Sequence, residues 1–398
     1  IYESDLGYAN LKIIASVQED DVLVVRDNDR HNYLDPVLSI EGLPAGSTYQ
    51  RAEFTPETSL VDTSTFEINL VSNEPALNGK LDWTVGAFYM DHEIENVIRG
   101  YRDDDLDGRI KYLCDESFAD PSYCYDHDYG IPGRFDIFGP NAEVDFFTDA
   151  NPSRESYSVY AQTTYSLADA FRIVSGLRYS EDTFTTDVTN FLNVESFQEE
   201  GTTDEITSRV VAEVDFSEDL MGYFALARGF KPGGSNLTFG FDDDNAPPMV
   251  FPTFEAETVD SVEFGLKSTF ADGAARANIA VFSYTYENLQ FQATDPDIYR
   301  GGVANIPESE MSGLEIEFTG FLTDSLSLDM NLAFLDSEVT SDYEVLDNVD
   351  AYPYFFGEED IRYGLRENVK GNQLSKTPEF TADITLKHET NLASGNSL

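Results

Sequence analysis

The segment DDDLDGR, which begins at Asp103, has the residue types and spacing best suited to metal chemistry in this sequence. Asp103, Asp105 and Asp107 alternate and a glycine follows, as in the first half of a calcium-binding loop. The twelfth position is Cys114 instead of the bidentate glutamate of an EF-hand, and the flanking residues are strand-like. A Ca²⁺ site in a loop and a plain acidic loop are both open interpretations, because a chain with 75 acidic residues produces such spacings by chance.

Cys114 and Cys124, the two cysteines of the chain, lie close behind this segment. A loop of this size closes readily as a disulfide, so we expect a bridge and an oxidising compartment. Two free thiols are the alternative.

The charge of the chain excludes one class of partner and indicates a habitat. A formal net charge of −51, with 24 Lys and Arg, excludes a nucleic-acid binder because phosphates would not be neutralised. The acidic residues are interleaved with a hydrophobic content of 41%, which excludes an acidic disordered tail. Such self-repulsion is best tolerated where salt or divalent cations screen it, which favours a marine or saline setting.

Alternation of apolar and polar residues is the main structural signal, and it recurs from one end of the chain to the other. In DSVEFGLKSTF, for example, Val262, Phe264 and Leu266 fall on one face of a strand while Ser261 and Glu263 fall on the other. About twelve strands are expected. They lie near 8–17, 65–72, 80–95, 155–167, 170–184, 208–216, 220–230, 258–270, 273–292, 312–322, 325–340 and 378–390.

The connections between these strands alternate strictly between short polar turns and long segments rich in Asp, Gly, Pro and Tyr. The long segments cover roughly 96–155, 185–206, 231–257, 293–311 and 341–377. Short turns at one end and long loops at the other, with strands of about 9 to 11 residues, are typical of an outer-membrane barrel. The sequence therefore predicts an all-β, antiparallel transmembrane β-barrel with long acidic extracellular loops. Aromatic residues near strand ends suit the interfacial belts of such a barrel: Tyr157, Tyr165, Tyr223, Phe230, Tyr284 and Tyr286.

Enzymatic readings of the sequence are weaker. Glu315 and Glu317 resemble a catalytic carboxylate pair, which leaves a soluble all-β glycoside hydrolase as the best enzyme alternative. Residues two apart on a strand share a face, however, and in a barrel both would line the wet interior. The four histidines lack metal-ligand spacing. We predict no catalytic residues, no enzyme and no required cofactor, with Ca²⁺ in a loop as the one optional ion.

Five segments, in this order and spacing, resemble the barrel of TonB-dependent outer-membrane receptors. They are YFALARGFKPGGSN (223–236), FEAETVDSVEFGLKSTF (254–270), ANIAVFSYTYENLQF (277–291), NIPESEMSGLEIEFTGFL (305–322) and GNQLSKTPEF (371–380). Family barrels have about 22 strands and carry a plug domain and a TonB-binding box, which nothing here resembles. By this resemblance, residues 1–398 are expected to be part of a receptor barrel without the plug and the last strands.

The resemblance implies a function in a Gram-negative outer membrane: active uptake of a scarce solute, most often a ferric siderophore, driven by TonB through the plug. It implies contact with membrane lipid and assigns no substrate-binding residue. The glycines of RGFKPGGSN are interpreted as structural, letting the chain leave the sheet after Phe230. Two other readings are a secreted, acidic, calcium-stabilised soluble β protein of adhesin type and a passive porin.

Overall fold

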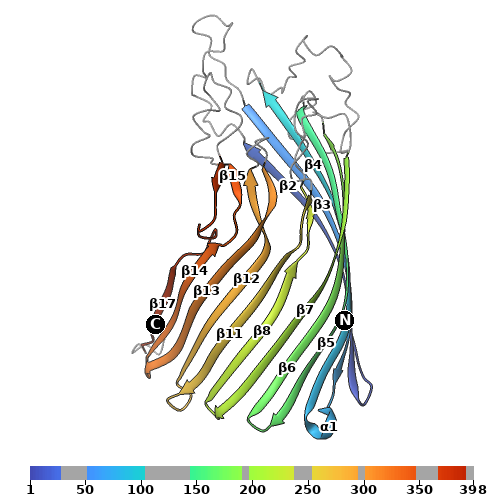
Figure 1. Ribbon diagram of the computed structural model, residues 1–398. Helices are drawn as coiled ribbons and strands as arrows, with labels where there is room; N and C mark the ends of the chain where they lie inside the picture. Colours follow the sequence, from blue (N-terminus) through green and yellow to red (C-terminus); the bar gives the residue numbers. More distant parts are fainter. Residues whose placement is uncertain are drawn as a thin grey trace, which may run out of the picture.

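The computed structural model of the protein describes residues 1–27, 52–103, 144–190, 197–236, 253–294, 301–346 and 366–390. In these ranges the chain forms a tall, curved antiparallel sheet of 13 strands, in the order β1-β2-β3-β4-β5-β6-β7-β8-β11-β12-β13-β14-β17 (Figure 1). The short connections gather at the lower edge in Figure 1, as the alternation of short and long segments predicts. The described ranges contain no candidate membrane-spanning helix.

The large sheet and its additions have the following bounds. The strands of the large sheet are β1 (Tyr2–Asp5), β2 (Ala9–Asp27), β3 (Ala52–Ser72), β4 (Leu81–Asp103), β5 (Val144–Ala168), β6 (Phe171–Asn190), β7 (Phe197–Ser217), β8 (Leu220–Lys231), β11 (Glu257–Phe270), β12 (Ala275–Thr294), β13 (Gly301–Thr323), β14 (Leu326–Val339) and β17 (Phe380–His388). Two small sheets pair β9 (Gly234–Ser235) with β10 (Thr253–Phe254) and β15 (Glu344–Leu346) with β16 (Arg366–Asn368). The short helix α1 (Ala76–Gly79) lies in the turn between β3 and β4.

Each of the twelve expected strands is present in the large sheet, which confirms the all-β antiparallel prediction. The edge strand β1 and the two small sheets were not expected. Segment 185–206, expected as a loop, is mostly strand, because β6 continues to Asn190 and β7 begins at Phe197. The hydrogen-bonded ladder of β6 thus continues beyond the stretch in which apolar and polar residues alternate.

The two faces of the large sheet differ in polarity. On the first, the register places Phe224, Phe264, Val281, Leu314, Phe334 and Phe380 in one continuous row across six strands. On the second, a parallel row holds Lys267, Asn278, Glu317, Asn331 and Asp383. We call these the apolar face and the polar face. A row of half-exposed aromatic and aliphatic side chains of this length is unfavourable in water, so the apolar face needs an apolar environment.

Beyond its apolar rows, in the part of the strands away from the short turns, the apolar face becomes acidic. Glu19, Asp62 and Glu93 stand directly opposite one another on β2, β3 and β4. Glu310 and Glu338 do the same on β13 and β14. Like charges directly opposite one another destabilise a sheet, and the destabilisation is larger when less salt is present to screen them. These acidic rows mark where contact with an apolar environment ends.

The aromatic side chains expected in belts divide between the two faces. Tyr157 and Tyr165 lie on the apolar face, toward opposite ends of its apolar rows, where interfacial belts are expected. Tyr223 and Tyr284 lie on the polar face with Glu263 and Glu315, so their assignment to a belt was wrong. Spacing in the sequence indicated strand ends correctly but did not separate the two faces.

Four aromatic rings of the polar face lie over glycines that stand directly opposite them on the next strand. The pairs are Tyr160 over Gly86, Phe184 over Gly201, Tyr223 over Gly265 and Phe282 over Gly313. A Cβ atom added at Gly86 would lie 2.5 Å from Cζ of Tyr160, and one at Gly313 would lie 2.6 Å from Cζ of Phe282. We call these four pairs interlocks, because the ring occupies the space that any larger residue opposite would need.

The interlock at Tyr160 is also held by hydrogen bonds. The Tyr160 hydroxyl lies 2.6 Å from both Oε1 of Glu67 and Oδ1 of Asn69, and the Asn69 amide donates to Glu67 at 2.9 Å. The guanidinium carbon of Arg178 lies 5.5 Å from the centre of the Tyr160 ring. The polar face is therefore an ordered network of polar side chains as well as a row of charges.

Candidate functional site

The segment that follows β8 turns onto the polar face. Residues 232–236 and 253–256, which we call the clasp, contain the paired strands β9 and β10. An added Cβ at Gly233 would lie 2.5 Å from the carbonyl oxygen of Phe254, and one at Gly234 would lie 2.6 Å from the Phe254 ring. These contacts support the structural interpretation of RGFKPGGSN, since the close approach of the two strands requires both glycines.

One side of the clasp is anchored to β5 and β6. Arg154 pairs with Asp182 and donates a hydrogen bond from Nη2 to the carbonyl oxygen of Gly233 at 2.8 Å. Asp182 is only 6% exposed, so its carboxylate depends on Arg154 as its counter-ion. A second contact joins the Ser235 hydroxyl to the Thr186 hydroxyl at 2.6 Å. Removal of Arg154 would leave a buried carboxyl group without its counter-ion.

The other side of the clasp is anchored to β13 by two asparagines that imitate strand pairing. The Asn236 side chain donates to the carbonyl oxygen of Val303 at 2.8 Å and accepts from its N–H at 2.7 Å. In the reverse direction, Asn305 accepts from the N–H of Glu255 at 2.8 Å and donates to its carbonyl oxygen at 3.0 Å. Asn236 is 5% exposed. The clasp thus bridges β5 and β6 to β13 across the polar face.

A second segment enters the same region from the strand next to β14. Backbone pairing of β14 is interrupted between Glu379, which accepts from Leu335, and Asn372, which accepts from Val339. Residues 373–378, which we call the bulge segment, leave the ladder there. Thr377 anchors the segment by a 2.7 Å hydroxyl contact with Ser337, a residue that is 7% exposed.

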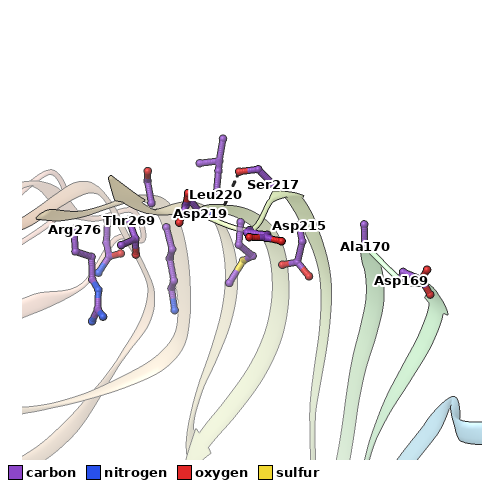
Figure 2. Close-up of a pocket in the computed structure, with 13 residues that line it drawn as sticks. Asp169, Ala170, Asp215, Ser217, Asp219, Leu220, Thr269 and Arg276 are labelled. Atoms are coloured by element: carbon purple, nitrogen blue, oxygen red, sulfur yellow. Dashed lines mark hydrogen bonds between the residues drawn. The ribbon is translucent and has the colours of Figure 1, made fainter. Parts of the chain in front are cut away.

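A cavity of about 750 Å³ lies at the opposite end of the sheet, along the short turns. Figure 2 shows its lining from Asp169 past Asp215 and Leu220 to Arg276, with the side chains standing along a row of turns. The N–H of Asp219 donates to the Ser217 hydroxyl at 3.3 Å. The lining does not converge on one point, so this cavity is not a built binding site.

A cavity of about 920 Å³, the upper cavity, is lined by Lys231 and Glu257, which flank the clasp in the chain, and by residues of the bulge segment. Its wall includes Tyr286, Gln292 and Met311 from β12 and β13, and the bulge segment contributes Gln373 and Thr377. Sequence reasoning did not locate this cavity, since its residues come from segments more than a hundred positions apart. The only hint was that both bordering segments, KPGGSN and GNQLSKTP, belong to the stretches that resemble a known family.

The predicted metal and disulfide residues cannot be compared with this site. Asp103 is the last residue of β4, and Asp105, Asp107, Cys114 and Cys124 lie outside the described residues. The calcium loop and the disulfide therefore stay predictions. In the described part of the chain no three His, Cys, Asp or Glu side chains are grouped to hold a metal ion. Glu317 accepts a hydrogen bond from Asn278 at 2.9 Å and shares the polar face with Glu315, as expected for an interior wall.

Comparison with known proteins agrees with this architecture. The family described as TonB dependent receptor-like, beta-barrel matches residues 18–396. The chain belongs to this family. TonB-dependent receptors are receptors and transporters of the Gram-negative outer membrane. Outer-membrane barrels have an apolar outer surface and a polar interior, and the two faces of this sheet follow that division.

The probable TonB-dependent siderophore receptor PiuA of Acinetobacter baumannii is 26% identical over 297 residues, which are 71% of this chain and 37% of PiuA. The pesticin receptor of Yersinia pestis is 28% identical over 226 residues, 54% of this chain and 30% of that receptor. The solved ferric yersiniabactin uptake receptor FyuA of Yersinia pestis shares the fold, with a TM-score of 0.63 at 15% identity over 98% of this chain and 46% of FyuA. The chain spans less than half the length of these relatives.

Proposed function

We propose that the protein is a TonB-dependent outer-membrane receptor that takes up a ferric siderophore. The observation that carries this proposal is the pair of opposed faces: an apolar row across six neighbouring strands, and a polar wall bearing a cavity and two inward segments. The apolar row disfavours the secreted soluble alternative. The names of the relatives, a siderophore receptor and a ferric yersiniabactin uptake receptor, support the choice of cargo.

The partners in this proposal are membrane lipid, the siderophore and TonB, which in this family acts through a plug domain and a TonB-binding segment. A marine or saline habitat is the finer part of the proposal. The directly opposed carboxylates of β2, β3, β13 and β14 support it, because salt reduces their repulsion. Bound Ca²⁺ at Asp103, Asp105 and Asp107 would act in the same direction by neutralising loop charge.

Uptake of radioactive iron tests the proposal. The complete gene is expressed in a Gram-negative host that lacks its own siderophore receptors, and siderophores from iron-starved cultures of the source bacterium are supplied as the iron complex. We expect uptake in a host with TonB and none in the same host without it. Equal uptake with and without TonB would support a passive porin instead, and no uptake in either host would contradict siderophore transport.

A further inference from the structure

The upper cavity differs in charge from the rest of the chain. The whole sequence carries 75 acidic and 24 basic residues. Among the described residues that line the upper cavity, the charged ones are Lys231 and Glu257, whose charges cancel. Glu257 accepts the N–H of Gln290 at 2.8 Å, so its carboxylate is already engaged with the wall. The described lining of this cavity therefore carries no net charge.

The uncharged lining supplies both hydrogen bonds and apolar contact. The side chains of Gln292 and Asn372 each offer an amide donor and an amide acceptor, while Phe291 and Met311 add apolar surface. The amide nitrogen of Gln373 already donates to the carbonyl oxygen of Thr377. Amide groups of this kind pair with carbonyl and N–H groups of an uncharged ligand, and apolar side chains cover its carbon skeleton. They supply no cation that would compensate for an anion leaving water.

We propose that the upper cavity takes a ferric chelate without net charge, such as a trishydroxamate, in which three singly charged groups neutralise Fe³⁺. This inference rests on the proposed siderophore function and adds the charge class of the cargo. A triscatecholate has three doubly charged groups and remains a trianion. It would be repelled by the acidic chain during approach, and in the cavity it would lose hydration beside one lysine, Lys231, whose charge Glu257 offsets.

Equilibrium binding to the purified full-length receptor tests this choice, with the neutral ferric trishydroxamate ferrichrome and the trianionic ferric triscatecholate enterobactin as probes. We expect the dissociation constant of the trianion to be larger by about tenfold or more. Added NaCl should raise the association rate of the trianion and leave that of the neutral chelate nearly constant, because salt screens only the charged encounter.

A charge introduced by mutation separates the cavity from the general field of the protein. Gln292→Lys places a cation in the upper cavity and should narrow the preference for the neutral chelate severalfold. Gln198→Lys is the matched control: it makes the same charge change on β7, at an exposed residue on the apolar-face side of the sheet, beyond its apolar rows. The control should keep the preference of the parent protein.

The outcomes distinguish this inference from the function on which it rests. A trianion that binds as tightly as the neutral chelate would overturn the inference and leave siderophore uptake intact. Equal effects of the two lysine variants would also overturn it, because the preference would then come from overall charge. If neither chelate binds, the proposed siderophore function fails and the inference fails with it.

Discussion

Replacement of Gly265 by alanine should disrupt the interlock with Tyr223. An added Cβ would overlap the Tyr223 ring, so the ring must move away. In its present position the Tyr223 hydroxyl donates to Oε1 of Glu263 at 2.5 Å, and the ammonium group of Lys267 lies 5.5 Å from the ring centre. Loss of a hydrogen bond to a charged group costs about 1.5–3 kcal/mol, and overpacking costs a further 1–3 kcal/mol or so. The ring can relieve the overlap by giving up the hydrogen bond, so the cost of the lost hydrogen bond and the cost of overpacking do not add in full. We therefore expect the free energy of unfolding to fall by about 2–4 kcal/mol.

Gly176→Ala is the matched control for Gly265→Ala. Gly176 also lies on the polar face, but the nearest atom to an added Cβ is the carbonyl oxygen of Ala161 at 4.0 Å. This control should be neutral or slightly stabilising, since alanine restricts the unfolded chain more than glycine does. Urea unfolding of the protein in lipid vesicles, followed by fluorescence of Trp83, the single tryptophan, gives both values. Equal destabilisation by the two substitutions would refute the reasoning, as would a Tyr223→Ala background in which Gly265→Ala costs just as much.

Three further expectations concern the anchors beside the upper cavity. Arg154→Met should lower the free energy of unfolding by about 3 kcal/mol at neutral pH, because it leaves the buried carboxylate of Asp182 without its counter-ion. The loss should be smaller at acidic pH, where protonation removes the uncompensated charge, and urea unfolding at acidic and neutral pH measures both. Asn236→Ala should accelerate hydrogen exchange at Val303 on β13, because the Asn236 side chain accepts a hydrogen bond from that N–H. An unchanged exchange rate would show that Asn236 does not hold the clasp to β13. A hydrogen bond from Asn368 lowers the pKa of Asp342. The pairing of β15 with β16 should therefore be fully stable above the usual carboxyl pKa and should weaken as pH falls through the lowered pKa of Asp342. Hydrogen exchange in these two strands should show this pH dependence, and the dependence should disappear in Asp342→Asn.

The strands were predictable from the sequence because one physical rule governs them. A strand with different solvents on its two faces alternates in polarity, and Val262, Phe264 and Leu266 on one face against Ser261 and Glu263 on the other show this within a few residues. Strand length was not predictable in the same way. Past Tyr179 the apolar face of β6 carries Glu181 and Thr183, so the signal ends while the backbone ladder continues to Asn190. The upper part of β6 is held by backbone hydrogen bonds, which leave no alternation of polarity in the sequence.

The anchors of the clasp escaped prediction for a different reason. Arg154 is 28 residues from Asp182 and 79 from Gly233, and Asn236 is 67 residues from Val303. Such pairs are made by sheet curvature and by the fold of a long connection, and neither leaves a periodic signal in the chain. The sequence did predict that Gly233 and Gly234 serve a structural role, because the need for glycine where the chain leaves the sheet depends on neighbouring residues. Local geometry is readable from neighbouring residues, whereas long-range polar contacts are not.

The four interlocks also bear on how so large a sheet finds its register. Slipping one strand by one residue exchanges the two faces and is strongly penalised, but slipping it by two restores the same alternation at little cost. A tight turn removes this ambiguity for strands that it joins. The interlocks lie instead between β4 and β5, β6 and β7, β8 and β11, and β12 and β13, which are pairs that the tight turns of the lower edge do not join. In those pairs a slip by two residues would place the aromatic ring against a side chain instead of a glycine. Each glycine therefore favours one register among several that have the same alternation of polar and apolar residues.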